Sequence, residues 1–232
     1  MVPVHFEDWG MIPYAEALEK QKKLQSLLVQ FKLENRENKS QGQSPNQYLI
    51  FCEHPPVYTL GNRAHMENLL ISEEDLKTRN IELFPIRRGG DITFHGPGQI
   101  VAYPILDLEY FFTDIHKYMR FLEEAVIRTL KDYGLESGRI DGLTGVWIDW
   151  EMSHRARKIS AEGVHCSRWV TMHGLALNVN TDLQYFENII PCGIQDKGVT
   201  SMSRELNQEL DIIKVKSRLK NHFASLFSID WV

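Results

Sequence analysis

Hydrophobic positions along the chain follow two spacings, and these predict a chain that alternates helices with strands. Apolar residues three or four positions apart mark three long stretches, which is the spacing of a helix with one buried face. The predicted helices begin at Pro13, run from Thr113 to Tyr133, and run from Asp211 to Phe227. Thr113 is the expected N-cap of the second helix, and Gly134 is its expected stop.

Short apolar runs between prolines, glycines and polar residues predict the strands. These runs are Val2 to Phe6, Tyr48 to Cys52, Ile81 to Ile86, Ile100 to Leu106, Gly145 to Asp149, Arg157 to Gly163 and Trp169 to Val179. The last three are expected to be antiparallel, and Ser72 is expected to cap a short helix. The polar stretch Glu34 to Gln47 is expected to be a mobile loop. We therefore expect a single domain over residues 1–232, of the α/β (α+β) class, with a mixed sheet flanked by helices.

Composition narrows the class of protein. The chain has 232 residues, of which 43% are hydrophobic and 25% charged, with a formal net charge of −5. An acidic balance argues against general nucleic-acid binding, although Arg87, Arg88, Arg155, Arg157 and Lys158 form local basic clusters that would suit an acidic protein partner. No apolar run approaches the roughly 20 residues of a membrane span. Three widely separated cysteines fit a reducing compartment, so we expect a cytoplasmic protein without a membrane anchor.

A glycine-rich stretch from Arg87 to Tyr103, reading RRGGDITFHGPGQIVAY, stands between two apolar runs. It predicts a strand, a polar loop and a second strand, and the loop carries a cation, a hydroxyl and an imidazole in Arg88, Thr93 and His95. Functional side chains favour loops held on rigid scaffolds. The spacing matches neither a dinucleotide-binding fingerprint nor a phosphate-binding P-loop. The alternative is a long connection with no chemical role.

Cys192 follows a proline and precedes a glycine, which predicts a tight turn that leaves the thiol accessible. An accessible thiol is a candidate nucleophile, and the alternative is a small apolar filler. Cys52 lies within an apolar run and is expected in the core. Cys166 is expected in a turn; with His165 and His173 it could bind a metal, but the spacing of a metal site is missing.

Lys158 is the second candidate for chemistry, in the predicted strand Arg157 to Gly163. Most strand lysines are solvated edge charges, and that alternative stays open. If Lys158 faces Cys192, it can activate the thiol. Lowering a thiol pKa from about 8.5 to about 7 requires roughly 2 kcal/mol, and one ammonium at about 4 Å supplies up to about 4 kcal/mol at an effective dielectric of 20.

Small residues mark the third element, His173 to Asn178, where Gly174 and Ala176 would let a long acyl chain or a backbone segment pass closely. The alternative is a strand glycine that marks a bulge. This element reads HGLALN. Together with EHPPVYTLG, RRGGDITFHGPGQ, RKISAEG and PCGI, it resembles the octanoyltransferases of lipoate synthesis. The resemblance covers nearly the whole chain, since the motifs are far apart and occur in the same order.

That resemblance implies the fold shared by biotin and lipoate protein ligases, and a dyad in which Cys192 is the acyl-thioester nucleophile and Lys158 its partner. It implies no metal and no cofactor. The implied substrate-binding residues are Arg88, Gly89, Gly90, Asp91, Ile92, Thr93, Phe94, His95, Ala161, Glu162, Gly163, Gly174, Leu175 and Ala176, with support from His54, Tyr103 and His173. Two residues depart from the family pattern: Glu162 replaces an apolar residue, and Asn62 replaces a basic one.

The implied activity is transfer of an octanoyl group from octanoyl-acyl carrier protein to a lysine of lipoyl domains or of the glycine-cleavage H protein, by a monomeric acyltransferase. Three alternatives remain open at this point. The first is an ATP-dependent lipoate or biotin protein ligase of the same fold. The second is a non-catalytic acyl-carrier-binding homologue. The third is a cysteine hydrolase in which His95 or His173 serves as the base.

Overall fold

A computed structural model describes residues 1–38, 45–190 and 197–232, with only the backbone described for 36–38. The described residues form a nine-stranded mixed sheet in the order β12-β1-β2-β6-β10-β9-β8-β7, with β11 paired to β9. Its strands are β1 (Val2–Met11), β2 (Tyr48–Glu53), β6 (Gln99–Ile105), β7 (Gly138–Ile140), β8 (Leu143–Ile148), β9 (Arg157–Ser167), β10 (Val170–Asn178), β11 (Gly198–Val199) and β12 (Ile229–Trp231). The expected mixed sheet is confirmed, and β8, β9 and β10 are antiparallel neighbours as predicted.

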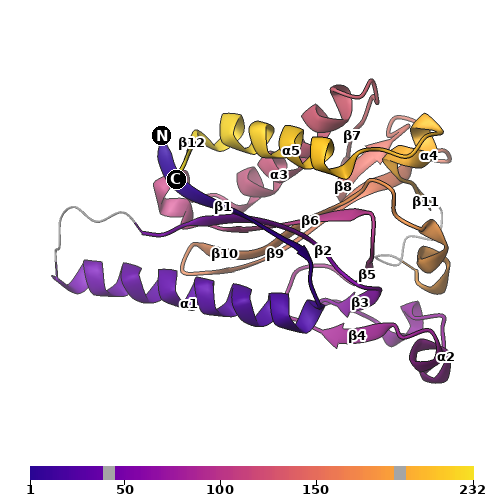
Figure 1. The fold of residues 1–232 in the computed structure, drawn as a ribbon, viewed down its shortest axis with the longest axis horizontal. Helices are drawn as coiled ribbons and strands as arrows, with labels where there is room; N and C mark the ends of the chain where they lie inside the picture. Colours follow the sequence, from indigo (N-terminus) through magenta and orange to yellow (C-terminus); the bar gives the residue numbers. More distant parts are fainter. Residues whose placement is uncertain (39–44, 191–196) are drawn as a thin grey trace.

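Helices cover both faces of this sheet (Figure 1). The long helix α1 (Tyr14–Asn38) packs on one face, where Ala17 and Leu28 meet Val101 and Ala176. Helices α3 (Ile115–Lys131) and α5 (Ile212–Phe227) pack together on the opposite face. This three-layer arrangement buries the periodic apolar stripes that the sequence displays. In the described part of the chain, no helix is both long and apolar enough to cross a membrane.

A second, smaller sheet lies at one end of the large one. It has three described strands in the order β4-β3-β5, namely β4 (Glu82–Pro85), β3 (Val57–Leu60) and β5 (Ile92–His95). Helix α2 (Glu73–Thr78) and the 3-10 helix η3 (Leu183–Asn188) pack against it through a separate apolar cluster. Helix α4 (Met202–Leu206) and the short 3-10 helices η1 (Met66–Asn68) and η2 (Leu108–Tyr110) complete the described elements.

Several predicted boundaries were wrong, each for a local reason. Helix α3 is capped by Asp114, whose side chain accepts from the Lys117 amide, rather than by Thr113. Helix α1 continues to Asn38, so only part of the polar stretch Glu34 to Gln47 is loop; residues 39–44 lie outside the described residues. Cys166 is in strand β9 and not in a turn.

The glycine-rich stretch is not one continuous loop, because its Ile92–His95 segment is strand β5 and pairs with β3. The runs before and after the stretch also belong to different sheets, since β4 is in the small sheet and β6 in the large one. The stretch therefore connects the two sheets, which the apolar pattern alone could not reveal.

Candidate active site

A cavity of about 860 Å³ lies where the glycine-rich stretch meets strands β9 and β10. Its size is within the range of small-molecule sites. The stretch is fixed there by main-chain pairing, since the Gly89 amide donates to the carbonyl of Val164 on β9 at 3.0 Å. This bond pairs the glycine-rich stretch with the edge of β9 beyond the end of β8. The stretch and β9 therefore belong to the same wall of the cavity.

Arg88 braces this wall from inside the protein. Its Nη2 donates to the Thr59 carbonyl oxygen at 2.8 Å and to Thr59 Oγ1 at 2.9 Å, and Nη1 donates to the Gly89 carbonyl at 3.0 Å. The side chain is buried although it lines the cavity. A guanidinium bonded to main-chain carbonyls on both sides holds the loop in one conformation.

Asp91 stabilises the same loop from its other side. Its Oδ1 accepts from the amides of Ile92 and His65, and its Oδ2 accepts from Asn68 Nδ2. A carboxylate that accepts several N–H donors organises the backbone around it. The acid predicted to bind substrate therefore ties β5 to the segment around η1.

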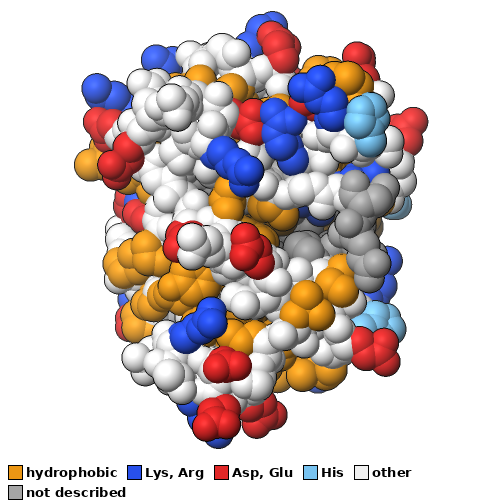
Figure 2. Space-filling model, turned by 90° about the vertical axis from the view of Figure 1, so that its right-hand side faces the viewer, with side chains coloured by type: hydrophobic (Ala, Val, Ile, Leu, Met, Phe, Trp, Pro, Cys, Tyr) orange, Lys and Arg blue, Asp and Glu red, His pale blue; other side chains and the backbone are white. Residues whose placement is uncertain are grey.

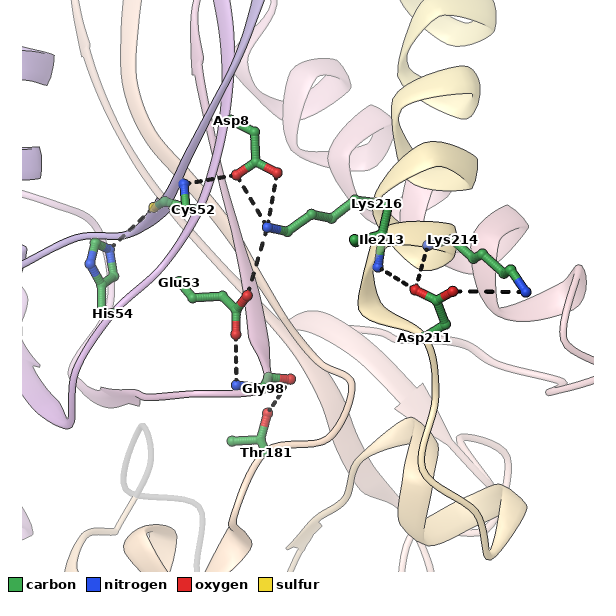
Figure 3. Close-up of polar contacts among 11 residues, drawn as sticks. Asp8, Cys52, Glu53, His54, Gly98, Thr181, Asp211, Ile213, Lys214 and Lys216 are labelled. Atoms are coloured by element: carbon green, nitrogen blue, oxygen red, sulfur yellow. Dashed lines mark hydrogen bonds and ion pairs between the residues drawn. The ribbon is translucent and has the colours of Figure 1, made fainter.

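Glu53 holds the far end of the glycine-rich stretch through an ionic cluster between β2 and α5 (Figure 3). Its Oε2 accepts from the Gly98 amide at 2.9 Å, while Lys216 Nζ lies 3.7 Å from its Oε1 and 3.0 Å from Asp8 Oδ2. The Gly98 carbonyl in turn accepts from Thr181 Oγ1 at 3.3 Å. The cluster fixes this loop from two distant segments of the chain.

Two buried tyrosines and two histidines meet on the α1 side of the large sheet. His54 Nδ1 lies 2.7 Å from the Ile12 carbonyl, so this nitrogen carries the proton, and Nε2 accepts from the Tyr103 hydroxyl at 2.7 Å. Tyr14 packs against both His54 and His95. Burial lowers the pKa of His54 to about 4, which keeps the imidazole neutral near pH 7.

His95 and His173 line the cavity as neutral imidazoles as well. Gln99 Nε2 donates to Phe94 O and Asn178 Oδ1, so Gln99 Oε1 accepts from His95 Nδ1 at 2.8 Å. Burial, with nearby positive charge, lowers the pKa of both histidines to about 3. His173 also has a φ of +63°, an uncommon conformation for a non-glycine residue inside a strand. Its Nε2 is buried without a hydrogen-bond partner in the part of the chain that the structure describes.

Lys158 is buried in the cavity wall and is not a solvated edge charge. Its ammonium lies 4.7 Å from the centre of the Trp147 ring, where the ring face attracts a cation. The position arises from a β-bulge, because Trp147 opposes Lys158 while the next residue back, Val146, opposes Ser160. The aliphatic stem of Lys158 lies against Gly145.

Ser160 and Glu162 follow Lys158 along β9 and also line the cavity. The hydroxyl of Ser160 donates to Glu162 Oε1 at 2.7 Å. Burial and the neighbouring carboxylate of Glu123 raise the pKa of Glu162 to about 7. The cavity therefore contains a carboxyl group able to change protonation near neutral pH.

Cys192, the predicted nucleophile, lies outside the described residues. The described residues on both sides of it are tied to the cavity. The Ile190 amide donates to the carbonyl of Asn68, a cavity residue, at 2.8 Å. Val199 of β11 lines the cavity and pairs with Lys158.

The sequence of this chain is similar to those of known proteins. The model of the lipoyl protein ligase A/B catalytic domain matches residues 26–224. An octanoyltransferase of Cytophaga hutchinsonii is 54% identical over 224 residues, covering 96% of this chain and 92% of the relative. One of Flavobacterium johnsoniae is 54% identical over 230 residues, covering 99% and 98%. The chain belongs to the octanoyltransferase family.

Solved structures agree with this octanoyltransferase family at the level of the fold. An archaeal bipartite lipoate protein ligase of Thermoplasma acidophilum superposes with a TM-score of 0.70 at 18% identity, covering 100% of this chain and 86% of the other. A lipoate-protein ligase A bound with ATP gives 0.66 at 18% identity, covering 100% and 87%. The expected ligase-like fold and the enzyme class, an acyltransferase, are confirmed.

Most residues that the family resemblance implied for substrate binding surround the cavity. They are Arg88, Gly89, Gly90, Asp91, Ile92, Thr93, His95, Ala161, Glu162, Gly163, Gly174, Leu175 and Ala176, together with Tyr103 and His173. Phe94 lies elsewhere, stacked on Tyr185 at 4.6 Å in the core of the small sheet. His54 is not itself in the cavity lining but contacts three residues that are, namely Tyr14, Tyr103 and His95. Gly174 must be small chiefly because a Cβ there would lie 2.1 Å from the Ala102 carbonyl oxygen of β6.

Sequence reasoning missed three residues of this octanoyltransferase-family site. Gln99 and Asn178 orient His95, and both stood within quoted motifs without being singled out. Tyr14 directly follows Pro13, the predicted start of a helix, and nothing in its local pattern marks it as a cavity residue.

Most of the basic residues expected to form clusters at the surface are buried or paired with acidic side chains. Arg157 pairs with Glu205 and Asp149, while Arg88 and Lys158 are buried, so Arg87 and Arg155 remain exposed. Figure 2 shows Lys, Arg and acidic side chains interspersed on the face that carries β11, α4 and α2. On this face charges of both signs are mixed.

Proposed function

We propose that this protein transfers an octanoyl group from octanoyl-acyl carrier protein to a lysine of lipoyl domains or of the glycine-cleavage H protein, through a thioester on Cys192. The observation that carries the proposal is the buried Lys158 ammonium in the wall of a substrate-sized cavity, in a chain of the octanoyltransferase family. Burial of a cation is costly unless its charge is used. A thiolate partner would use it.

In the first half of the proposed reaction, the Cys192 thiolate attacks the thioester carbonyl carbon and the pantetheine thiolate leaves. Lys158 gives its proton to this leaving group, so the acyl-enzyme contains a neutral lysine. In the second half, the acceptor amine attacks the Cys192 thioester and Lys158 takes up a proton as the amide forms. The starting pair of thiolate and ammonium is thereby restored. A thioester is already activated, so neither ATP nor a metal is required.

The histidines support this division of roles. His54, His95 and His173 are held neutral by burial, so they are poor competitors for the thiolate. We propose that they line the acyl-binding side of the cavity together with Tyr103. We further propose that the enzyme acts as a monomer in the cytoplasm.

Intact mass spectrometry tests the proposal. Mixing the wild type with octanoyl-acyl carrier protein, without ATP, should add one octanoyl group, which a lipoyl domain should then remove. Cys192→Ser should abolish both the adduct and turnover. Cys166→Ser is the matched control, since Cys166 lies on β9 away from the cavity lining, and it should behave as the wild type. Normal transfer by Cys192→Ser would refute the covalent route.

A further inference from the structure

Glu162 faces a different side of the large sheet from the histidine cluster. It is directly opposite Leu175 in the β9–β10 ladder, and Ser160 is opposite Leu177. Directly opposed residues of antiparallel strands project to the same face. Leu175 and Leu177 belong to the cluster under α3 and α5, whereas Tyr103 and Ala176 belong to the cluster under α1. Glu162 therefore lies on the α3 side, whereas His54 and His95 lie against Tyr14 on the α1 side.

The cavity continues onto this α3 side, where Met119 of α3 and Leu143 and Thr144 of β8 line it with Glu162. Its two sides differ in chemistry. The α1 side presents aromatic rings and neutral imidazoles, which suit an apolar chain. The α3 side presents a hydroxyl and a carboxyl group, which suit a polar or cationic partner.

One oxygen of Glu162 has nothing to bind within the described residues. Oε1 accepts from Ser160, but Oε2 is buried and has no hydrogen-bond partner in residues 1–38, 45–190 and 197–232. A buried polar atom without a partner costs free energy, so such an atom at a cavity wall calls for an explanation. Because Glu162 lines the cavity, a turn of its carboxyl group toward the cavity would let a donor supplied by a substrate satisfy this oxygen.

The charged groups near Glu162 do not supply the missing hydrogen bond to Oε2. Glu123 of α3 is the closest acidic influence on Glu162, and it is fully satisfied by Arg139, Arg120 and the Gly145 amide. Arg120 and Lys158 attract the ionised form of Glu162, but within the described residues neither is hydrogen-bonded to its Oε2, and burial and Glu123 outweigh them. The charged groups facing Glu162 are thus Glu123 and Arg120 from α3 and Lys158 from its own strand.

The reaction proposed above needs a group of this kind. An acceptor lysine has an ordinary pKa of about 10.4 and arrives as an ammonium, which cannot attack a carbonyl carbon until it loses a proton. In the acyl-enzyme Lys158 is neutral and can accept only one of the two protons that this nitrogen must lose. A carboxylate beside the entering ammonium pairs with its charge and can accept the other proton.

We propose that Glu162 receives the side-chain ammonium of the acceptor lysine at its free Oε2 and removes the first of the two protons which that nitrogen must lose. The inference rests on the proposed acyl transfer. The N–H bond breaks, the proton moves to Oε2, and the nitrogen lone pair forms the C–N bond with the thioester carbon. The second proton goes to Lys158 as the C–S bond breaks and the Cys192 thiolate leaves. The Glu162 proton returns to solvent with product release.

A binding cycle tests the contact without any turnover. Calorimetry should measure the affinity of an unmodified lipoyl domain for wild-type enzyme and for Glu162→Gln, and then repeat both with a lipoyl domain whose acceptor lysine is methionine. Glu162→Gln should weaken binding of the lysine domain about tenfold, the size of a charge-assisted hydrogen bond, and leave binding of the methionine domain unchanged. Glutamine keeps the size and can still accept from Ser160. Glu151→Gln, which removes an exposed carboxylate in the 149–154 turn, is the matched control for net charge and should show no coupling.

A kinetic readout tests the proton transfer. Octanoyl transfer to the lipoyl domain should be slowed at least tenfold by Glu162→Gln. Transfer to hydroxylamine, which is already neutral at pH 7, should be slowed less, so that the ratio of the two rates falls in Glu162→Gln. Equal effects on the two nucleophiles, or zero coupling in the binding cycle, would overturn the inference. If the binding coupling appears but no octanoyl adduct forms on Cys192, the acceptor site stands and the covalent route fails, so the two proposals are separable.

Discussion

At the scale of single residues, the ionisable groups of the cavity lie in different environments on the two faces of the sheet. His95, on the α1 side, and His173 are kept neutral by burial. Lys158 lies at the bulge of β9, and Glu162 lies on the α3 side with a pKa raised to about 7. Groups whose environments push their pKa values apart can divide acid and base roles between them.

Lys158→Arg separates the charge of this residue from its proton. Arginine keeps a positive charge but cannot release a proton near neutral pH. We expect the octanoyl adduct on Cys192 to form, although more slowly, and its discharge to a lipoyl domain to slow by at least tenfold. Rapid-quench mass spectrometry would time the two halves separately. Lys158→Ala provides the comparison, since the midpoint of iodoacetamide alkylation of Cys192 should rise toward the free-thiol value of about 8.5. If Lys158→Arg discharges the adduct at the wild-type rate, Lys158 contributes only its positive charge and transfers no proton.

At the scale of elements, strand β8 determines where the Lys158 side chain can lie. Gly145 has a φ of +128°, and a Cβ built on it would lie 3.0 Å from Lys158 Cε and 3.3 Å from Cδ. The adjacent bulge brings Lys158 and Ser160 to successive positions opposite β8. The glycine, the bulge and the Trp147 ring together hold a flexible side chain in one place.

Gly145→Ala should therefore reduce transfer as well as stability. The new methyl group collides with the Lys158 stem, and the backbone is strained by roughly 1 to 3 kcal/mol. Gly134→Ala is the matched control, because Gly134 has a φ of +75° at the end of α3 and nothing within 4 Å of its Cβ position. Thermal unfolding should show both variants destabilised, and steady-state transfer should fall only in Gly145→Ala. Equal activity of the two variants would mean that the Lys158 position does not depend on β8.

At the scale of the whole molecule, the two ends of the chain lie together at one edge of the large sheet. Strand β12 pairs in parallel with β1, and the two termini lie side by side (Figure 1). Cavity residues come from segments as far apart as Tyr14 and Val199, so the site exists only in the assembled fold. Its buried ionisable groups therefore link stability to pH.

We expect the free energy of unfolding to fall as the pH drops from 6.5 to 5. The pKa of His54, His95 and His173 is lowered by burial to about 4, 3 and 3, so between these values and 6.5 the unfolded chain binds more protons. Their stabilisation is present above pH 6.5 and is lost on acidification, by up to about 2 kcal/mol per histidine at pH 5. Glu162 acts in the opposite direction, because its raised pKa favours the folded state at lower pH.

Guanidinium unfolding at pH 7 and pH 5 measures this linkage. His173→Asn should reduce the difference between the two pH values, since asparagine tolerates the positive φ and does not titrate. The exposed His116→Gln is the control and should retain the wild-type difference. A stability that is equal at pH 5 and pH 7 would show that the buried imidazoles are not held neutral.

The sequence by itself determined the elements and the family. Apolar spacing located the helices that became α1, α3 and α5 and the strands β2, β6, β8, β9 and β10, because burial of one face imposes a period on each element. The separated motifs determined the family, because residues with chemical roles stay recognisable without their surroundings, in strands β9 and β10 as well as in loops. Capping was less certain: Ser72 caps α2 as predicted, but Asp114 replaced Thr113 in α3.

Only the tertiary structure decided which faces and edges these residues share. A β-bulge reverses the alternation that sequence spacing assumes, so the position of Lys158 could not be read from strand periodicity. The glycine-rich stretch joins two sheets because β5 pairs with β3, a contact between segments more than thirty residues apart. The free oxygen of Glu162 likewise follows from long-range packing, since it is buried beside residues of α3 and β8 and has no donor within residues 1–38, 45–190 and 197–232. Burial and partnership depend on residues that are distant in the chain, and for that reason the local pattern is silent about them.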